Sequence, residues 1–222
     1  MIVINSATPK NPITLIGECI GPCYGSDTSD PEKNYKRGLN SIKAGHGRVL
    51  EYANAWFTIS EYSARVIREF YTHIGGAPTR TQASTRYINE SNFDYYKPFM
   101  NEQASALYEQ TMKNINLAYK MLTEDFGISK EDAANVLPLG MYTTVSCHMN
   151  ARTLMTMAEQ RLCTRAYKEY RVLMYDIIQA LSQYSDEWAT LCKMVMKVKC
   201  DKAGFCEEEF SCGRWPKKDI DE

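Results

Sequence analysis

The first part of the chain carries hydrophobic and polar patterns typical of strands. The opening stretch MIVINSATP predicts a short strand that a Thr-Pro pair ends. In RVLEYANAWFTIS, apolar residues alternate at Ala55, Phe57 and Ile59, which predicts a strand with one buried face. Between these two segments, the polar stretch SDTSDPEKNYKR predicts a loop, and Gly38–Ala44 predicts a short helix.

A helix is predicted from Glu61 to about His73, because apolar residues recur at every fourth position, at Val66, Phe70 and Ile74. A polar series with the same spacing falls on a neighbouring face: Arg65, Glu69 and His73. On spacing alone, a solvated charged face explains this series. The segment THIGGAPTRTQASTRYI then ends the helix, since its paired glycines and its proline disfavour helical backbone. It predicts a positively charged, hydroxyl-rich loop.

Helical patterns dominate the second half of the chain. A long helix is predicted from Asn101 to about Phe126, with an apolar face of Leu107, Ile115, Ala118 and Leu122. A capping box of Ser129 and Asp132 predicts the start of a compact helix, and Met141 to about Leu181 predicts further helices. Ser185 is expected to cap a last helix that carries four apolar residues: Trp188, Leu191, Val195 and Val198.

A few early strands followed by many helices predict the α+β class. We expect one domain over residues 1–199 and a polar, Cys-containing tail over residues 200–222, irregular from Asp201 onward.

One predicted late helix combines polar and apolar residues on a single face: Asn150, Leu154, Met157 and Arg161. A buried arginine needs a counter-charge or a bound anion, because an unpaired buried charge is costly to desolvate. Arg161 is therefore a candidate anion-binding residue. An intramolecular ion network between Arg161 and Glu169 is the alternative.

Composition narrows the function classes only slightly. Of the 222 residues, 44% are hydrophobic and 24% are charged, and the net charge of −1 creates no overall attraction to nucleic acid or to an anionic membrane. The sequence has neither an apolar run long enough to cross a bilayer nor a recognisable signal peptide at its start. We expect a cytoplasmic protein without nucleic-acid or membrane partners.

Eight cysteines are many for such a protein. The closely spaced C-x₂-C pairs of structural zinc sites are absent from the sequence, so we expect no metal site. Reduced thiols are favoured, and a metal or disulfide staple near the C-terminus is the alternative. That alternative concerns Cys192, Cys200, Cys206 and Cys212.

Three blocks, taken together and in order, resemble the flavin-dependent thymidylate synthases. They are GHGRVLEYANAWFTISEYSARVIREFYTH, QASTRYI and VLPLGMYTTVSCHMNARTLMTMAEQRLCTRAYKEYR. The resemblance covers roughly residues 1–180. It implies a ThyX-like fold, with a small antiparallel sheet and long helices, that assembles as a homotetramer with shared active sites. It also implies methyl transfer to C5 of dUMP to give dTMP, with 5,10-methylenetetrahydrofolate as carbon donor, FAD as cofactor and NADPH as reductant, and no cysteine nucleophile.

The resemblance assigns the hydroxyl-rich loop to the nucleotide. Ser84 and Arg86 match the residues that bind its phosphate, and Glu69 takes the place of a glutamine that contacts it. Arg161 matches the catalytic arginine that favours ionisation of the pyrimidine at N3, since a fixed cation stabilises negative charge in the ring. Backbone N–H groups of the same loop are also expected to face the phosphate, at Gln82, Ala83 and Thr85.

A second set is expected to hold the cofactor. His73 matches the signature histidine that contacts the flavin, and Asn150 and Arg152 match an Asn-x-Arg that binds FAD. The remaining members of this set lie in the Gly-His segment or beside these matches: His46, Arg48, Glu51, Ile74 and Thr156.

The chain departs from the family's Arg-His-Arg signature, which reads Thr72-His73-Ile74 here. The interval from His73 to Ser84 is also about two residues longer, through GGAPTR. Because a phosphate dianion needs several donors, we hypothesise that Arg80 restores one lost charge. A further family arginine falls at Ala134 or Asn135 in this sequence.

Three functions follow from these residues. The first is methylation of dUMP. The second is methylation or hydroxymethylation of another pyrimidine nucleotide, and the third is a non-catalytic flavin or nucleotide binder. The presence of Arg161 favours catalysis over the third, because a scaffold gains nothing from a costly arginine on that face.

Overall fold

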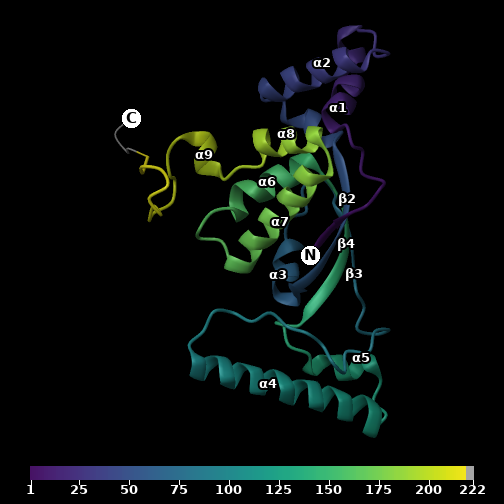
Figure 1. The fold of residues 1–222 in the computed structure, drawn as a ribbon, viewed down its shortest axis with the longest axis vertical. Coiled ribbons are helices and arrows are strands. Elements are labelled where there is room, and N and C mark those ends of the chain that lie inside the picture. Colours follow the sequence, from purple (N-terminus) through teal and green to yellow (C-terminus); the bar gives the residue numbers. More distant parts are fainter. Residues whose placement is uncertain (219–222) are drawn as a thin grey trace. The chain divides into compact units, whose positions relative to one another are not determined.

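The computed structural model describes residues 1–218 and confirms the predicted α+β class (Figure 1). The described chain forms two compact units. The first comprises residues 1, 58–72 and 80–146, and the second comprises residues 2–57, 73–79 and the chain from 147 onward. The strands of the described residues form one sheet in the order β1-β2-β4-β3, with bounds Ile2–Ile4, Asn54–Ser63, Tyr142–Asn150 and Thr79–Gln82.

The strand predicted around Ala55, Phe57 and Ile59 is confirmed as β2, and all three side chains are buried. Strand β4, by contrast, occupies a segment for which we predicted helices from Met141 onward, and that part of the prediction is wrong. Alternate residues of β4 are buried, at Thr143, Val145, Cys147 and Met149. Branched side chains in alternation pack well on a pleated sheet, and this outweighs a helical period in the same residues.

Two helices near the start of the second unit differ from the sequence prediction. Helix α1 spans Pro12–Ile20, and a short 3₁₀ turn follows at Gly21–Tyr24. Helix α2 spans Pro31–Lys43, so the predicted loop over SDTSDPEKNYKR is wrong in its second half, and the predicted short helix at Gly38–Ala44 is its continuation. The side chain of Asp30 accepts hydrogen bonds from two backbone N–H groups of the first turn, which makes Asp-Pro a helix start.

Helices α1 and α2 lie side by side with their backbones in close approach (Figure 1). A β-carbon on Gly17 would lie 1.7 Å from the carbonyl oxygen of Asn34, and one on Gly38 would lie 2.1 Å from that of Ile13. Glycine at both positions is therefore what allows this contact, since any side chain would separate the helices.

The helices that end the second unit follow in sequence: α6 Ala151–Arg161, α7 Lys168–Tyr184, α8 Asp186–Val195 and α9 Lys199–Ala203. The predicted cap at Ser185 is confirmed, because its hydroxyl accepts a hydrogen bond from the backbone N–H of Trp188. We predicted an irregular tail from Asp201 onward, and this is wrong at its start, because α9 extends to Ala203. The last four residues of the predicted tail lie outside the described residues.

In the first unit, α3 spans Ala64–Phe70 and is shorter than the predicted helix. Ser63 caps its N-terminus, and the preceding Glu61 has a φ of 63°, which is incompatible with a helix that starts there. Ile74 is 76% exposed and does not belong to the apolar stripe. His73 lies beyond the helix end, so it does not share a helical face with Glu69, which corrects the predicted polar series.

The long helix predicted from Asn101 is confirmed as α4, Glu102–Lys120, with a π turn at Met121–Asp125. Its buried residues are Met112 and Tyr119, whereas Leu107 of the predicted apolar face is 71% exposed. The predicted cap at Ser129 is confirmed at α5, Lys130–Ala133, because its hydroxyl accepts a hydrogen bond from the N–H of Asp132. The Asp132 carboxylate accepts from the Ser129 hydroxyl, and a 3₁₀ turn follows at Ala134–Val136. Among the described residues, none of the helices combines the length and apolar character needed to cross a membrane.

Candidate functional site

The start of α6 forms the centre of the candidate site in the second unit. Asn150 ends β4 and caps α6, with its Oδ1 accepting a hydrogen bond from the N–H of Thr153 at 2.8 Å. The N–H of Ala151 donates to the carbonyl of Ala53 at 2.7 Å, which ties the first turn of the helix to the residue directly before β2. The predicted cofactor residue Asn150 is therefore 8% exposed and fixed in orientation.

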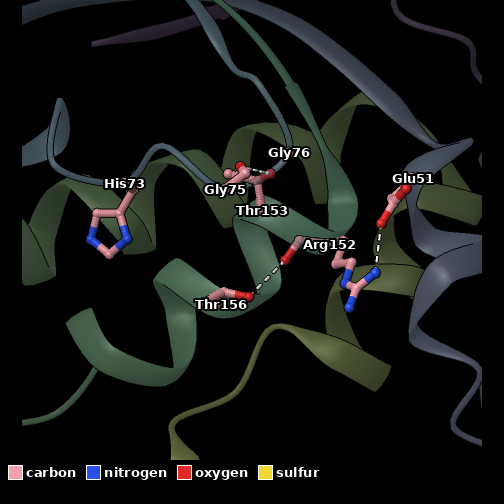
Figure 2. A pocket seen from close by; sticks show the side chains of 7 residues that line it. All are labelled: Glu51, His73, Gly75, Gly76, Arg152, Thr153 and Thr156. Atoms are coloured by element: carbon pink, nitrogen blue, oxygen red, sulfur yellow. Dashed lines mark hydrogen bonds and ion pairs between the residues drawn. The ribbon is translucent and has the colours of Figure 1, made fainter.

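A cavity of about 320 Å³ opens at this helix start. Figure 2 shows the residues that line it. Four of the predicted cofactor residues line it, although they come from three separate segments of the chain. The complete lining consists of Glu51, His73, Gly75, Gly76, Arg152, Thr153 and Thr156. The structure thus brings together residues that the sequence separates by about a hundred positions.

An ion pair forms one side of this cavity. Nη1 of Arg152 lies 2.6 Å from Oε1 of Glu51, and Figure 2 shows the two side chains pointing toward each other. Both side chains are nearly half exposed. The hydroxyl of Thr156 donates to the carbonyl of Arg152 one turn earlier, at 3.1 Å. The guanidinium is therefore held at the cavity while it stays accessible to a ligand.

A glycine turn forms another side. The hydroxyl of Thr153 donates to the carbonyl of Gly75 at 2.7 Å, which docks the turn on the first turn of α6 (Figure 2). Gly76 has a φ of +77° and leaves open the space next to Thr153. From the sequence we predicted these glycines only as helix breakers, and Thr153 was not among the predicted site residues. The signal that could have found them is the position of the paired glycines inside the insertion that follows His73.

The expected catalytic Arg161, at the end of α6, contacts the expected flavin residue His73. Its Nε donates a hydrogen bond to Nε2 of His73 at 3.0 Å. The guanidinium carbon also lies 4.7 Å from the centre of the Tyr170 ring, whose side chain is fully buried on α7. Sequence reasoning missed Tyr170, because a tyrosine on a helix gives no local sign of a partner. Glu169, the alternative partner of Arg161, is buried with 2% exposure.

Three other predicted cofactor residues, His46, Arg48 and Ile74, do not line the 320 Å³ cavity. His46 lines a second cavity of about 340 Å³, together with Leu50 and Met155. Arg48 lies on the 3₁₀ turn Gly47–Glu51, between His46 and Glu51 in the chain. Ile74 is exposed and is not among the residues that line either cavity.

The predicted nucleotide loop belongs to the first unit and is described by itself. Gln82 ends β3, and its side-chain amide donates to the hydroxyl of Thr143 at 3.3 Å. The N–H of Ala83 donates to the carbonyl of Thr144 in β4 at 2.8 Å. This N–H group, which we expected to face the phosphate, is therefore engaged in a hydrogen bond to the sheet. This corrects the expectation for Ala83.

The rest of the loop is more accessible. The hydroxyl of Ser84 accepts a long hydrogen bond, 3.4 Å, from the N–H of Arg86, and Thr85 lies between them. Nε of Arg86 lies 3.1 Å from Oε2 of Glu131, with both side chains about 60% exposed. A surface pair of this kind is worth little, about 0–1 kcal/mol, so Arg86 can exchange Glu131 for an anion.

Arg80 is folded back onto the end of α3. Its Nη1 donates to the carbonyl of Phe70 at 2.6 Å, and its guanidinium carbon lies 4.7 Å from the centre of the Tyr71 ring. The preceding residue of α3 is the predicted nucleotide residue Glu69, whose carbonyl accepts the hydroxyl of Thr72 at 2.7 Å. Arg80 thus stabilises the C-terminal end of the helix that carries Glu69.

Comparisons with known proteins agree with the blocks quoted above. The family model described as "Thymidylate synthase complementing protein" matches residues 4–185. The flavin-dependent thymidylate synthase of Nitratidesulfovibrio vulgaris is 30% identical over 240 residues, which cover 94% of this chain and 92% of the relative. That of Pyrococcus abyssi is 29% identical over 74% of this chain and 69% of its own length.

A solved structure is similar in fold. The flavin-dependent thymidylate synthase of Helicobacter pylori, in complex with FAD and dUMP, superimposes with a TM-score of 0.69 at 18% identity. The superposition covers 86% of this chain and 98% of that chain. The predicted ThyX-like fold is confirmed by this likeness.

Proposed function

The chain belongs to the thymidylate synthase complementing protein family, and we propose that it transfers a methyl group to C5 of dUMP to give dTMP. The carbon donor is 5,10-methylenetetrahydrofolate, the cofactor is FAD and the reductant is NADPH. The observation that carries this proposal is the gathering of predicted cofactor residues around one cavity, with Arg161 hydrogen-bonded to His73.

The residues around the 320 Å³ cavity fit a flavin nucleotide. Arg152 offers a cation for a phosphate group, and Thr156 and Thr153 place hydroxyl groups at the same wall. The glycine turn leaves a space that a single β-carbon on Gly76 would fill, so a flat ligand can approach the backbone closely. A flavin held there would supply the hydride chemistry of the reaction.

Arg161 is the proposed catalytic residue. Its guanidinium is half-buried at the end of α6, where water is partly excluded and electrostatic interactions are stronger than in bulk solvent. A cation held beside the pyrimidine favours the form ionised at N3 and stabilises the negative charge of that ring, which makes C5 a better nucleophile. The chain's own contribution is therefore a fixed charge.

The proposed phosphate site is the loop of the first unit. Ser84 and Arg86 offer a hydroxyl and an exposed guanidinium, with Gln82 and Thr85 beside them in the chain. Arg80 contributes a further positive charge next to the helix that ends after Glu69. The N–H of Ala83 is excluded from this role, since it belongs to the sheet.

The homotetramer with shared active sites is part of the proposal. Helix α4 and its continuation expose large apolar side chains at Leu107, Leu117 and Phe126, with exposures of 71%, 58% and 66%. Large apolar side chains exposed on one helix are typical of a surface that another subunit covers. A cytoplasmic location, and the absence of nucleic-acid and membrane partners, stay predictions.

One observation favours a second candidate function, methylation or hydroxymethylation of another pyrimidine nucleotide. The two positions that flank His73 lack the positive charge of the family signature. Thr72 donates its hydroxyl to the carbonyl of Glu69, and Ile74 is 76% exposed. A nucleotide site with fewer cations can accept a different ligand.

Purified protein tests both candidates. We expect a yellow protein whose visible spectrum shows bound flavin, and whose NADPH oxidation depends on dUMP and methylenetetrahydrofolate. Mass spectrometry of the product from isotope-labelled folate distinguishes a methyl from a hydroxymethyl group. A protein that binds flavin but oxidises NADPH without regard to any pyrimidine nucleotide would contradict both.

A further inference from the structure

The guanidinium of Arg161 is held by two rings from different segments of the second unit. His73 lies in the segment that follows the end of α3, and Tyr170 lies in the first turn of α7. The two rings meet edge to face, with centres 6.0 Å apart and an interplanar angle of 88°. Arg161 thus lies over one ring and in hydrogen-bond contact with the other.

The hydrogen bond fixes the protonation state of the histidine. An arginine side chain only donates hydrogen bonds, so Nε2 of His73 must accept the one from Nε of Arg161. An imidazolium has two donors and cannot accept. The contact therefore requires a neutral His73 that carries its proton on Nδ1.

The same contact restricts how Arg161 can bind a ligand. Because Nε is engaged with His73, a planar ligand cannot take the side of the guanidinium that includes Nε. The Tyr170 ring adds a second constraint, since the guanidinium carbon lies over this ring, 4.7 Å from its centre. Fixing a long side chain in advance removes the rotamer entropy that it would otherwise lose on binding.

We propose that Tyr170 and His73 are positioning residues for Arg161, and that His73 couples the flavin cavity to the pyrimidine. This inference rests on the proposed function. His73 lines the 320 Å³ cavity and also bonds Arg161, so a ligand that orders His73 orders the arginine. By linkage, the nucleotide then strengthens flavin binding by the same factor as the flavin strengthens nucleotide binding.

Substitutions at Tyr170 test the positioning role. Tyr170→Phe keeps the ring face, whereas Tyr170→Leu removes it and keeps an apolar side chain. Met174→Ala is the matched control, because Met174 is fully buried on the same helix. Each protein is assayed for thermal midpoint, FAD affinity from flavin fluorescence, the dissociation constant for dUMP, kcat and KM.

For Tyr170→Phe we expect a dUMP dissociation constant within about twofold of wild type, since the cation–ring contact is retained. For Tyr170→Leu we expect dUMP affinity to fall by about 5-fold to 30-fold, the range that corresponds to a partly desolvated cation–ring contact. Its FAD affinity and thermal midpoint should match those of the Met174→Ala control. If Tyr170→Leu and Met174→Ala give the same dUMP affinity, or if Tyr170→Phe is as weak as Tyr170→Leu, Tyr170 has no positioning role.

Substitutions at His73 test the coupling. Gln places an oxygen acceptor near the position of Nε2, whereas Ala offers none. The dUMP dissociation constant is measured on flavin-loaded and flavin-free protein for wild type, His73→Gln and His73→Ala. We expect the ratio of the two constants to exceed about 5 in wild type, in the usual range of coupling. It should be retained in part by His73→Gln and approach 1 in His73→Ala.

A ratio near 1 in wild type, or an unchanged ratio in His73→Ala, would overturn the coupling. The proposed function fails separately, when wild-type protein shows no nucleotide-dependent NADPH oxidation. If the wild-type protein is active but its dUMP affinity does not depend on the flavin, only the coupling through His73 is contradicted.

Discussion

A β-carbon on Gly76 would lie 2.4 Å from the hydroxyl oxygen of Thr153 and 2.9 Å from Nδ2 of Asn150. The φ of +77° at Gly76 adds backbone strain to any side chain. Gly75, its neighbour, lacks both restrictions, because a β-carbon there would meet open space. The two glycines therefore form a matched pair for testing whether the turn belongs to the cofactor cavity.

We expect Gly76→Ala to lower FAD affinity by at least about tenfold, because the new methyl group forces the turn away from α6. An alanine at positive φ also strains the backbone by about 1 kcal/mol or more. Gly75→Ala should leave FAD affinity within about twofold of wild type, as expected for an unstrained surface substitution. Flavin fluorescence titration measures both. Equal FAD affinities for the two variants would show that the turn is not part of the cofactor site.

We expect the Arg152–Glu51 pair to contribute more to cofactor binding than to stability. Both side chains are nearly half exposed, so Arg152→Ala should change the free energy of unfolding by less than about 1 kcal/mol. If Arg152 binds a phosphate of FAD, the same change should weaken FAD binding by about 10-fold to 100-fold, as for a charged hydrogen bond. Lys97→Ala breaks an exposed pair with Glu109 and serves as control. A substantial loss of stability with normal FAD affinity would assign Arg152 a structural role.

Arg80 offers a test of charge replacement in the nucleotide site. Arg80→Ala removes the hydrogen bond to the carbonyl of Phe70 and the contact with Tyr71. We expect dUMP affinity to fall by about tenfold, with a small loss of stability, about 1 kcal/mol for one hydrogen bond. Arg80→Lys keeps the charge and should recover part of the affinity. Unchanged dUMP affinity in Arg80→Ala would show that Arg80 only stabilises the end of α3 and does not contribute to nucleotide binding.

The thiols should differ in reactivity with pH. A hydrogen bond from the side chain of Thr164 lowers the pKa of Cys212, whereas burial raises the pKa of Cys192 to about 12. Since the thiolate is the nucleophile, alkylation of Cys212 should decline only as the pH falls through its lowered pKa. Cys192 should stay unmodified up to high pH. Peptide mass spectrometry after brief iodoacetamide treatment measures both, with Cys212→Ser as control, and faster labelling of Cys192 would contradict this assignment.

Glu187 of α8 stabilises the start of α1 across 174 residues of sequence. Its carboxylate accepts hydrogen bonds from the N–H groups of Ile13 and Thr14, at 2.7 and 2.9 Å, and from the Thr14 hydroxyl. We expect Glu187→Ala to destabilise the fold by about 1–3 kcal/mol, the range for a lost cap with buried donors. Urea denaturation measures this, and Glu18→Ala, at an exposed position on α1, is the control. If Glu187→Ala and Glu18→Ala have similar free energies of unfolding, water replaces the hydrogen bonds of the Glu187 cap.

Local patterns in the sequence determined several elements and the family. The alternation at Ala55, Phe57 and Ile59 defined a strand, and hydroxyl caps at Ser129 and Ser185 marked two helix starts, because these signals involve residues within one turn or one strand. The three blocks in order carried the family assignment. They also supplied four of the residues that line the cavity: Glu51, His73, Arg152 and Thr156.

Tertiary structure alone decided which residues touch. The segment after Met141 has apolar positions compatible with either a helix or a strand, and pairing within the sheet selects the strand. Close approach of Gly17 to Asn34, docking of Gly75 on Thr153, and the hydrogen bond from Arg161 to His73 all join distant positions. Periodicity records which side of an element is apolar, but it carries no information about the partner of that side. The site is defined by such partners, 88 residues apart in the case of His73 and Arg161.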